Sequence, residues 1–254
     1  MKRDWILIIL WPIVASVISI IFKTNFFIST VLFYIVPSIY ISIRHSAFIK
    51  KTLIVSAVTL PMLLVVDYIA VKTGTWFFPT SVFSERLFGT TVLEVVLWLF
   101  SYVYTVIIFY EYFLEHTCKN YFTNRKLKYV FIGFSLLFLV FLLSLLATGS
   151  FVHIPYFYLV FGLVFGLIPI GFTLAKHPKL LTKFVSVTAY FSLSSFLWEI
   201  VALRLGQWTF PGSSFIGWVE ITNVRFPFEE FLVWIVLGAA SILAWYELFD
   251  DDGN

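Results

Sequence analysis

Asp67-Tyr-Ile-Ala-Val-Lys-Thr-Gly-Thr-Trp-Phe-Phe-Pro79 recurs 132 positions later as Glu199-Ile-Val-Ala-Leu-Arg-Leu-Gly-Gln-Trp-Thr-Phe-Pro211. An acidic residue, a basic residue, a glycine, a tryptophan, a phenylalanine and a proline keep their places in both copies. Matches between apolar residues arise by chance in an apolar chain, whereas rare residue types that agree at one offset are hard to explain that way. The stretch indicates an internal repeat, and a repeat determines the whole fold.

The same offset holds upstream of this stretch, without gaps. The pairs that it aligns are Phe33 with Phe165, Pro37 with Pro169, His45 with His177, Lys51 with Lys183, Val55 with Val187, Ala57 with Ala189 and Ala70 with Ala202. Downstream, after a four-residue insertion, Glu94 and Trp98 match Glu230 and Trp234. We therefore predict a tandem duplication, with a first unit over residues 1–118 and a second unit over residues 119–254.

The composition places both units in a membrane. Of the 254 residues, 61% are hydrophobic and 12% are charged, and the mean hydropathy is +0.97. Soluble domains carry about 25% charged residues. An α-helix needs about 20 apolar residues to cross a bilayer. Runs of about that length lie at 5–22, 25–43, 52–71, 91–114, 128–147, 154–175, 184–203 and 227–247. The sequence thus predicts an all-α integral membrane protein with eight transmembrane helices.

Lysine and arginine residues divide the connectors between these runs into two classes. The N-terminus and the even connectors hold Lys2, Arg3, Arg44, Lys50, Lys51, Lys119, Arg125, Lys126, Lys128, Lys176, Lys179 and Lys183. The odd connectors hold only Lys23, Lys72, Arg86, Arg204 and Arg225. Because cytoplasmic loops carry the excess of basic residues, we expect both termini in the cytoplasm. We expect the membrane itself to be the plasma membrane of a prokaryote.

The number of spans fixes the relation between the two predicted units. Each unit contains four spans, an even number, so both units cross the membrane in the same direction, as in parallel-repeat membrane proteins. Active groups are then expected between the two units.

Several classes of cofactor site are missing from the sequence. The single cysteine, Cys118, excludes an intrachain disulfide and a cysteine-based metal site. There is no glycine-rich phosphate loop, dinucleotide fingerprint or histidine pair with metal-ligand spacing. We expect no metal, no cofactor and no nucleic-acid partner.

Acidic residues within the apolar runs are the first candidates for function. They are Asp67, Glu94, Glu199, Glu229 and Glu230, all near the non-cytoplasmic ends of their spans. A charged residue inside a membrane costs roughly 2.5–3.5 kcal/mol and usually has a function. The structural alternative for Glu94 and Glu229 is a stabilising position in the first turn of a helix. Asp67 and Glu199 lie near helix C-termini, where the helix dipole disfavours a negative charge. For them the structural alternative is an ion pair with Lys72 or Arg204.

Tryptophans accompany these acids. Trp98 and Trp234 lie one turn inside from Glu94 and Glu230, and Trp76 and Trp208 follow the glycine of each repeat. Aromatic faces stabilise a desolvated cation by about 2 kcal/mol. The competing explanation is an interfacial belt, where tryptophan is common. We take these four residues as candidates for substrate binding, and the interfacial explanation applies mainly to Trp76 and Trp208.

Together these motifs resemble the heterodimer-type lycopene cyclases and their fused single-chain relatives. Arg225-Phe-Pro-Phe-Glu-Glu-Phe231 is the closest match to the signature of that family, and Gly74-Thr-Trp76 and Gly206-Gln-Trp208 resemble its other recurring elements. The resemblance covers most of the chain, as two copies. The first copy departs from it, because Thr91-Val-Leu-Glu94 lacks the proline and the first glutamate.

The resemblance implies a reaction, a substrate and a set of roles. The reaction is an isomerisation without a redox step, in which an acid protonates the terminal C=C of lycopene and a carboxylate takes up a ring proton. Glu229 and Glu230 are implied as the donor–acceptor pair, with Asp67, Glu94 and Glu199 tuning them or relaying protons. The substrate is implied to be an apolar polyene that reaches the site from the membrane lipid.

Two other functions remain open at this point. One is cyclisation of another long isoprenoid by the same residues. The other is a proton-coupled transporter or binding protein, which parallel repeats and intramembrane acids also suit. Transporters usually have broken helices, whereas the glycines and prolines here lie mostly at span ends. The sequence leaves open whether the chain binds copies of itself or enzymes of the same pathway.

Overall fold

The computed structural model describes residues 2–115, 125–150 and 152–248 of the chain. The predicted boundary between the two units, at 118/119, and Cys118 lie outside these residues. Helices make up most of the described chain, and the strands are few and short.

Seven of the eight predicted spans are confirmed in position among the described residues. Seven helical segments in the described chain are long and apolar enough to cross a membrane: Lys2–Phe22, Phe26–Arg44, Ser46–Lys72, Leu93–Glu115, Leu127–Thr148, Phe157–Lys176 and Pro178–Arg204. Glu230–Val236 and Gly238–Glu247 are long and apolar enough only when they are taken together, and they give an eighth span if this bent pair is a single span. Such a set of helices is consistent with an integral membrane protein.

Several spans consist of more than one element. The helical elements are α1 (Lys2–Phe22), α2 (Phe26–Thr30), η1 (Val31–Ile35), α3 (Val36–Arg44), η2 (Ser46–Phe48), α4 (Ile49–Lys72), α5 (Leu93–Tyr110), η3 (Glu111–Glu115), α6 (Arg125–Thr148), α7 (Phe157–Phe161), η4 (Gly162–Leu167), α8 (Ile168–Lys176), η5 (Pro178–Leu180), α9 (Leu181–Arg204), η6 (Glu230–Val236) and α10 (Gly238–Glu247). The segments η1, η3, η4 and η6 are π-helical. In η1 and η4 the wider turns precede Pro37 and Pro169, which have no N–H to donate to the preceding turn.

The eighth span is not the continuous helix that the sequence predicts. Its two parts meet at an angle of 52°, with Leu237 between them. A Cβ on the next residue, Gly238, would lie 2.8 Å from the Tyr102 hydroxyl. A larger residue at this position would require the Tyr102 side chain to shift. The expectation of unbroken helices is therefore wrong for this span.

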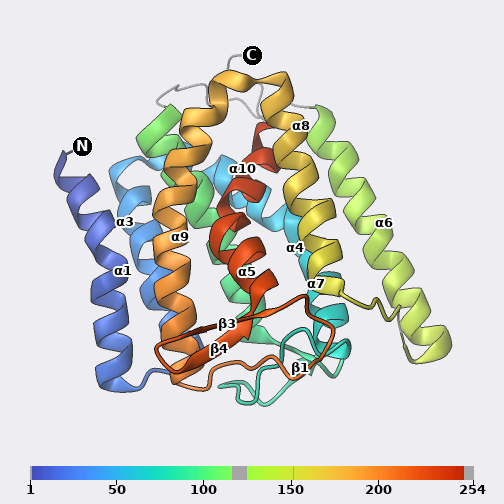
Figure 1. The fold of residues 1–254 in the computed structure, drawn as a ribbon. Helices are drawn as coiled ribbons and strands as arrows, with labels where there is room; N and C mark the ends of the chain where they lie inside the picture. The colour runs from blue at the N-terminus through green and yellow to red at the C-terminus, as the bar shows by residue number, and fades with distance from the viewer. Residues whose placement is uncertain (1, 116–124, 151, 249–254) are drawn as a thin grey trace.

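The central helices are α5 and α9, and the outermost are α1 and α6 (Figure 1). α1 packs against α9, and α6 packs against α4. In the α6 segment Leu127–Thr148, only 6% of the most apolar 18-residue stretch is buried inside the protein. In Leu93–Glu115 the corresponding share is 72%. The exposed side chains of α6 between Tyr129 and Leu146 are apolar, as expected of a helix that faces lipid. α1 begins and α10 ends at the same end of the bundle (Figure 1).

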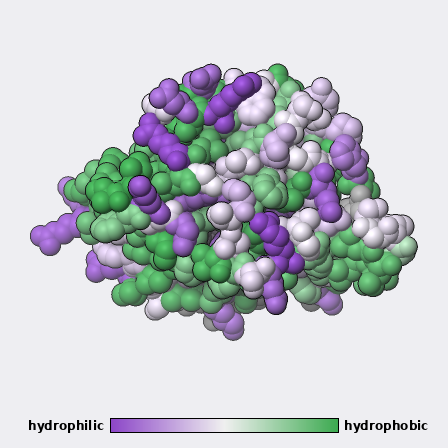
Figure 2. Space-filling view, turned by 90° about the horizontal axis from the view of Figure 1, so that it is seen from below, coloured by the Kyte–Doolittle hydropathy of each residue, from purple (hydrophilic) through white to green (hydrophobic). Residues whose placement is uncertain are grey.

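Two short hairpins form in the long connectors, where the sequence predicted only loops. They pair β1 (Arg86–Leu87) with β2 (Thr91–Val92), and β3 (Trp218–Ile221) with β4 (Val224–Pro227). Thr222 and Asn223 have positive φ, as a two-residue hairpin turn requires. The hairpins lie at the end of the bundle opposite to the start of α1 (Figure 1). Figure 2 shows this end, where hydrophilic side chains lie among hydrophobic ones.

The other end contains a buried ion pair that the sequence analysis missed. Lys51 Nζ on α4 lies 2.9 Å from Glu111 Oε1 on η3, and the Tyr246 hydroxyl on α10 donates to the same oxygen. All three residues are buried. The pair joins three spans near the cytoplasmic side of the predicted topology.

We predict that Lys51→Met lowers the free energy of unfolding by about 3–5 kcal/mol, because it leaves the Glu111 carboxylate buried beside an apolar side chain. Denaturation of the protein in mixed detergent micelles measures this. The matched control is Lys50→Met, because Lys50 is exposed. Equal stability of the two variants would show that the ion pair contributes nothing.

Candidate functional site

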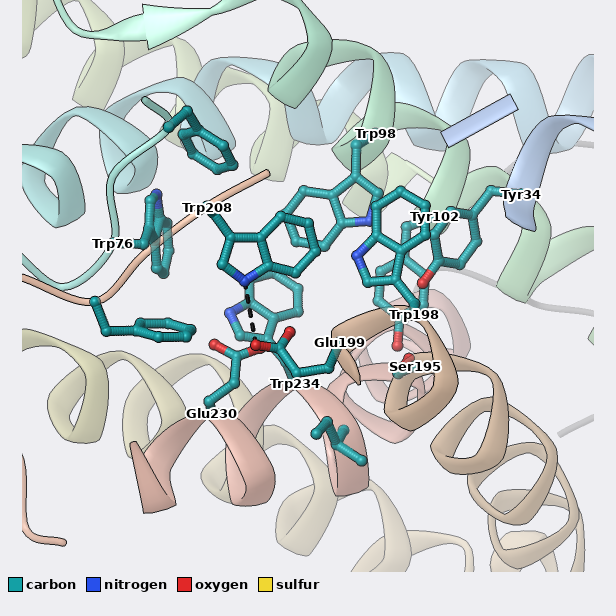
Figure 3. Close-up of a pocket in the computed structure, with 13 residues that line it drawn as sticks. Tyr34, Trp76, Trp98, Tyr102, Ser195, Trp198, Glu199, Trp208, Glu230 and Trp234 are labelled. Carbon is teal, nitrogen blue, oxygen red and sulfur yellow. Dashed lines mark hydrogen bonds between the residues drawn. The ribbon is translucent and has the colours of Figure 1, made fainter. Parts of the chain in front are cut away.

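A cavity lined by aromatic side chains lies between the two halves of the chain (Figure 3). It has about 30 Å³ of free space, enough for a group of one or two non-hydrogen atoms. Its walls come from η1, α5, α9, η6 and the two long connectors. The lining residues are Tyr34, Trp76, Phe78, Trp98, Tyr102, Ser195, Trp198, Glu199, Trp208, Phe210, Glu230, Trp234 and Ile235.

Two of the five predicted acids line this cavity, Glu199 on α9 and Glu230 at the start of η6. Their carboxyl groups point toward each other and interact directly (Figure 3). Trp208 Nε1 donates to Glu199 Oε1 at 3.1 Å, and the Tyr158 hydroxyl donates to Glu230 Oε2. Both acids are buried. We refer to this space as the acid cavity.

Asp67 does not reach the acid cavity. Trp76 Nε1 donates to its Oδ1 at 2.8 Å, and Thr91 Oγ1 donates to its Oδ2 at 2.5 Å. One carboxylate oxygen thus binds a side chain of the first long connector, and the other binds a side chain of β2. Trp76 in turn forms part of the cavity wall. Asp67 therefore positions the wall rather than facing a ligand.

Glu94 and Glu229 also lie outside the acid cavity. Ser81 Oγ donates to both oxygens of Glu94, and the Val82 N–H donates to Oε1 at 2.5 Å. The Ile216 N–H donates to Glu229 Oε1 at 2.7 Å. Each glutamate ties the connector before its helix to the first turn of that helix. Of the predicted pair Glu229 and Glu230, only Glu230 lines the acid cavity, because neighbouring residues on a helix point in different directions.

The basic residues near the acids bind other groups. Arg86 donates to the carbonyls of Thr90 and Phe78, and Arg204 donates to that of Thr222. The Lys72 ammonium lies 5.7 Å from the centre of the Tyr68 ring, and the Arg225 guanidinium lies 4.4 Å from that of Trp218. Among the described ion pairs, none joins these bases to the five acids. The structural alternative considered for Asp67 and Glu199, pairing with Lys72 or Arg204, is not observed.

All four predicted tryptophans, Trp76, Trp98, Trp208 and Trp234, line the acid cavity. The rings of Trp98 and Trp234 are 5.3 Å apart, and those of Trp76 and Trp234 are 6.4 Å apart. Rings this close form a continuous aromatic wall of the cavity.

Other residues of the site were not predicted. Trp198 directly precedes Glu199, and this adjacency was the only signal for it in the sequence. Tyr34, Tyr102 and Tyr158 lie on three different spans and have no acid nearby in the sequence, so only the packing of these spans brings them to the site.

A second, more apolar cavity lies next to the acid cavity and shares Tyr102 and Trp234 with it. Its free space is about 100 Å³. The lining residues are Val55, Val58, Thr59, Met62, Leu63, Leu99, Tyr102, Val103, Leu127, Val130, Phe134, Phe161, Phe165, Gly166, Val233, Trp234, Gly238, Ser241, Ile242, Trp245 and Tyr246. We call it the chain cavity. The acid cavity, with its two carboxyl groups, thus adjoins a cavity lined mainly by apolar side chains.

In the parts of the chain that the structure describes, no three His, Cys, Asp or Glu side chains are grouped so that they could hold a metal ion. Comparison of the chain with protein-family models, with curated proteins and with solved structures finds no match.

Proposed function

We propose that this chain is a membrane enzyme that cyclises the ends of a linear, lycopene-type isoprenoid, by acid-initiated ring closure without net redox change. One observation carries the proposal. Glu199 and Glu230 face each other in an aromatic cavity that adjoins a second cavity lined mainly by apolar side chains. The similarity of Arg225–Phe231 to the lycopene cyclase signature adds to it.

The pair of carboxyl groups suits the required proton transfers. Two buried carboxyl groups in contact are most stable when they share one proton, because like charges repel. That proton adds to the terminal C=C and forms a C–H bond and a tertiary cation. The internal C=C attacks the cation and closes the ring, and loss of a ring proton to the carboxylate restores the pair. The substrate is isomerised and no electron acceptor is needed.

The aromatic walls of the acid cavity would stabilise the carbocation intermediate. The ring faces of Trp98, Trp208 and Trp234 can stabilise a desolvated cation, by about 2 kcal/mol. Trp208 and Tyr158 also donate to the two carboxyl groups and hold them in place. Exclusion of water protects the cation from hydration.

The chain cavity would hold the hydrocarbon next to the reacting end. Its wall on α4 runs from Val55 to Leu63, which is about 12 Å along a helix. The free space in the acid cavity is smaller than an isoprenoid end group, so Trp234 or Tyr102, which separate the cavities, must move to admit it. Side-chain rearrangements of this size are common on binding.

We also propose that the fold is a parallel duplication with a pseudo-two-fold axis through the site. Phe77 and Thr209, which are 132 residues apart, exchange N–H···O bonds of 2.8 Å in both directions. Reciprocal contact between equivalent residues is expected where a two-fold axis passes. α9 begins and ends 132 residues after α4. The first helix of the first unit, α1, packs against α9, the third span of the second unit. The first helix of the second unit, α6, packs in the same way against α4, the third span of the first unit, which supports the same relation.

The contacts favour a different alignment for the last helix of each unit. Glu94 and Glu229 both hold a backbone N–H of the preceding connector, so Glu94 corresponds to Glu229 and not to Glu230. Trp98 still corresponds to Trp234, which leaves one extra residue in the second unit. The π-helical segment η6 takes up such a residue. Glu230 is then the residue without a counterpart, and the proposed enzyme has one acid pair.

The proposed orientation places the hairpin end outside the cytoplasm. We predict that single cysteines at Ser84 and Ser213, in a Cys118→Ser background, react with an impermeant thiol reagent added to intact prokaryotic cells. Both serines are exposed and lie in the long connectors. A cysteine at Lys50, on the other side, serves as the control and should react only after permeabilisation. The reverse pattern would overturn the orientation.

Expression in cells that accumulate lycopene tests the proposed reaction. We expect lycopene to be replaced by cyclic products of the same mass, detected by chromatography of the extracted pigment with mass spectrometry. An unchanged pigment, with the protein present in the membrane, would exclude lycopene as the substrate. Cells that accumulate other linear isoprenoids would then test the wider class.

A proton-coupled transporter or binding protein is the second candidate, and the broken eighth span favours it. In a transporter the bend at Leu237, in the same span as Glu230, would let the helix change shape around the substrate. The two candidates differ in the fate of the isoprenoid. A transporter would redistribute it between membrane sides or cells without changing its retention time.

A further inference from the structure

The two cavities are too small to enclose a long isoprenoid. The free space is about 100 Å³ in the chain cavity and about 30 Å³ in the acid cavity. An apolar cavity of about 150 Å³ accommodates a single benzene molecule. The two cavities therefore hold one end group, and the rest of a lycopene-type chain must lie outside them.

The walls of the chain cavity differ in their exposure. Next to the acid cavity, Tyr102 and Val233 are buried. On the side of α6 and η4, Val130, Phe134 and Phe161 are only half-buried, so they line the cavity and also reach the surface of the protein. The exposed large side chains beside Phe134 on α6 are apolar. This side of the chain cavity therefore faces lipid.

α6 borders the chain cavity without closing it. It packs at length against α4, and among the described helices no comparable contact joins it to η4, α8 or α10. The ring centres of Phe134 on α6 and Trp245 on α10 are 6.2 Å apart. Trp245 Nε1 in turn donates to the Phe165 carbonyl on η4 at 2.9 Å. The mouth of the cavity thus has α6 on one side and η4 with Trp245 on the other.

Under the proposed duplication, the corresponding place in the first half of the chain is closed by α1. This helix packs against α9 and also against η1 and α2 of its own half. Trp11 Nε1 on α1 donates to the Leu32 carbonyl on η1 at 2.6 Å. The residue 132 positions after Trp11 is Leu143, which is exposed and has no side-chain donor. Tyr34 is buried on η1 at the place where η4 has Gly166, which has no side chain.

We infer that the gap between α6 and η4 is a lateral entrance, through which one end of the isoprenoid passes from the bilayer into the chain cavity. The residues that line the entrance are Val130, Phe134, Phe161 and Phe165. The inference rests on the proposed function, since it names how the same site takes up its substrate. The body of the chain stays in the entrance and in the lipid, so only one end at a time reaches Glu199 and Glu230. An isoprenoid with two ends that can cyclise must withdraw and re-enter before its second ring forms.

Photo-cross-linking with tritium-labelled lycopene tests the position of the entrance. The photoreactive amino acid p-benzoylphenylalanine replaces Phe134, and the whole protein is reconstituted in lipid nanodiscs. We expect illumination to label the protein saturably, so that excess unlabelled lycopene removes most of the label. The matched control is the same replacement of Leu136, which lies at nearly the same depth on α6 but is exposed. Its labelling should be weak and unaffected by the competitor.

A bulky residue in the entrance tests the same inference by affinity. Val130→Trp should lower the affinity for lycopene by about tenfold or more, because the added ring fills space that the chain needs. Ile132→Trp adds the same side chain two residues away, on the exposed face of α6, and should leave the affinity unchanged. The measure is the lycopene concentration that half-saturates labelling at position 134.

Two results would overturn the inference. One is labelling at position 134 that unlabelled lycopene does not reduce, and the other is equal affinity of Val130→Trp and Ile132→Trp. Neither measurement requires turnover. Saturable labelling by a protein that forms no cyclic product would refute the proposed function alone, and cyclic product with either overturning result would refute the entrance alone.

Discussion

Glu230→Gln is expected to lower turnover of the isoprenoid by about 10²–10⁴-fold, the usual contribution of a positioned acid or base. Glutamine keeps the size of the side chain and still accepts the hydrogen bond from the Tyr158 hydroxyl. It has no proton that can be transferred to an alkene. Because a neutral amide is no harder to bury than a protonated carboxyl group, the amount of folded protein in the membrane should be close to that of the unaltered protein.

The neighbouring residue provides the matched control for this experiment. Glu229→Gln makes the same chemical change one position earlier, outside the acid cavity, and its amide oxygen can still accept from the Ile216 N–H. Its turnover per molecule should stay within about threefold of the unaltered rate. Normal turnover in Glu230→Gln, or an equal loss in both variants, would contradict the assignment of Glu230 as the acid. Turnover is measured as cyclic product per molecule of membrane-inserted protein.

The spans were predictable because the bilayer imposes a direct physical requirement. Each crossing needs about 20 apolar residues, and such runs are visible without any knowledge of packing. Asp67 and Glu199 stood out for a related reason, since a carboxylate inside an apolar run is costly. The four tryptophans were found because they recur beside these acids.

The remaining features depend on contacts between residues distant in the sequence. Tyr158 is 72 positions from Glu230, and nothing near it in the chain indicates that its hydroxyl reaches the acid. The proposed correspondence of Glu94 with Glu229 could not be read from the sequence, because a π-helical turn adds one residue without interrupting the apolar pattern. Lys51 was assigned to a cytoplasmic connector, and its partner Glu111 was not considered, since only the packing of α4 against η3 and α10 shows that both are buried.

The broken eighth span has a similar origin. Gly238 lies inside an apolar run, where a glycine is common in membrane helices and predicts little on its own. A Cβ on Gly238 would lie 2.8 Å from the Tyr102 hydroxyl, a contact that appears only when α10 and α5 are packed together. The sequence of one helix does not contain this contact.

The second large effect is expected at Glu199, where the two halves of the chain can be compared. Glu199 and Asp67 hold corresponding places, nine residues before the tryptophan that donates to each of them. They differ in their second partner, because Thr91 donates to Asp67, whereas Glu199 faces Glu230. We predict that Glu199→Gln lowers turnover by about 10²–10⁴-fold, since the amide can neither share a proton with Glu230 nor take one from the ring.

The corresponding change in the first half should have little effect on turnover. In Asp67→Asn the amide oxygen can still accept from Trp76 Nε1, and its NH₂ group can donate to the Thr91 hydroxyl, which is also an acceptor. Turnover per molecule should stay within about threefold of the unaltered rate. Both variants remove one buried carboxyl group at the end of a long helix, so a general effect of lost charge on folding would appear equally in the two. If Asp67→Asn loses turnover as Glu199→Gln does, the chemistry involves both halves and the single acid pair is wrong. If neither variant loses turnover, the carboxyl pair is structural and the acid must be sought elsewhere.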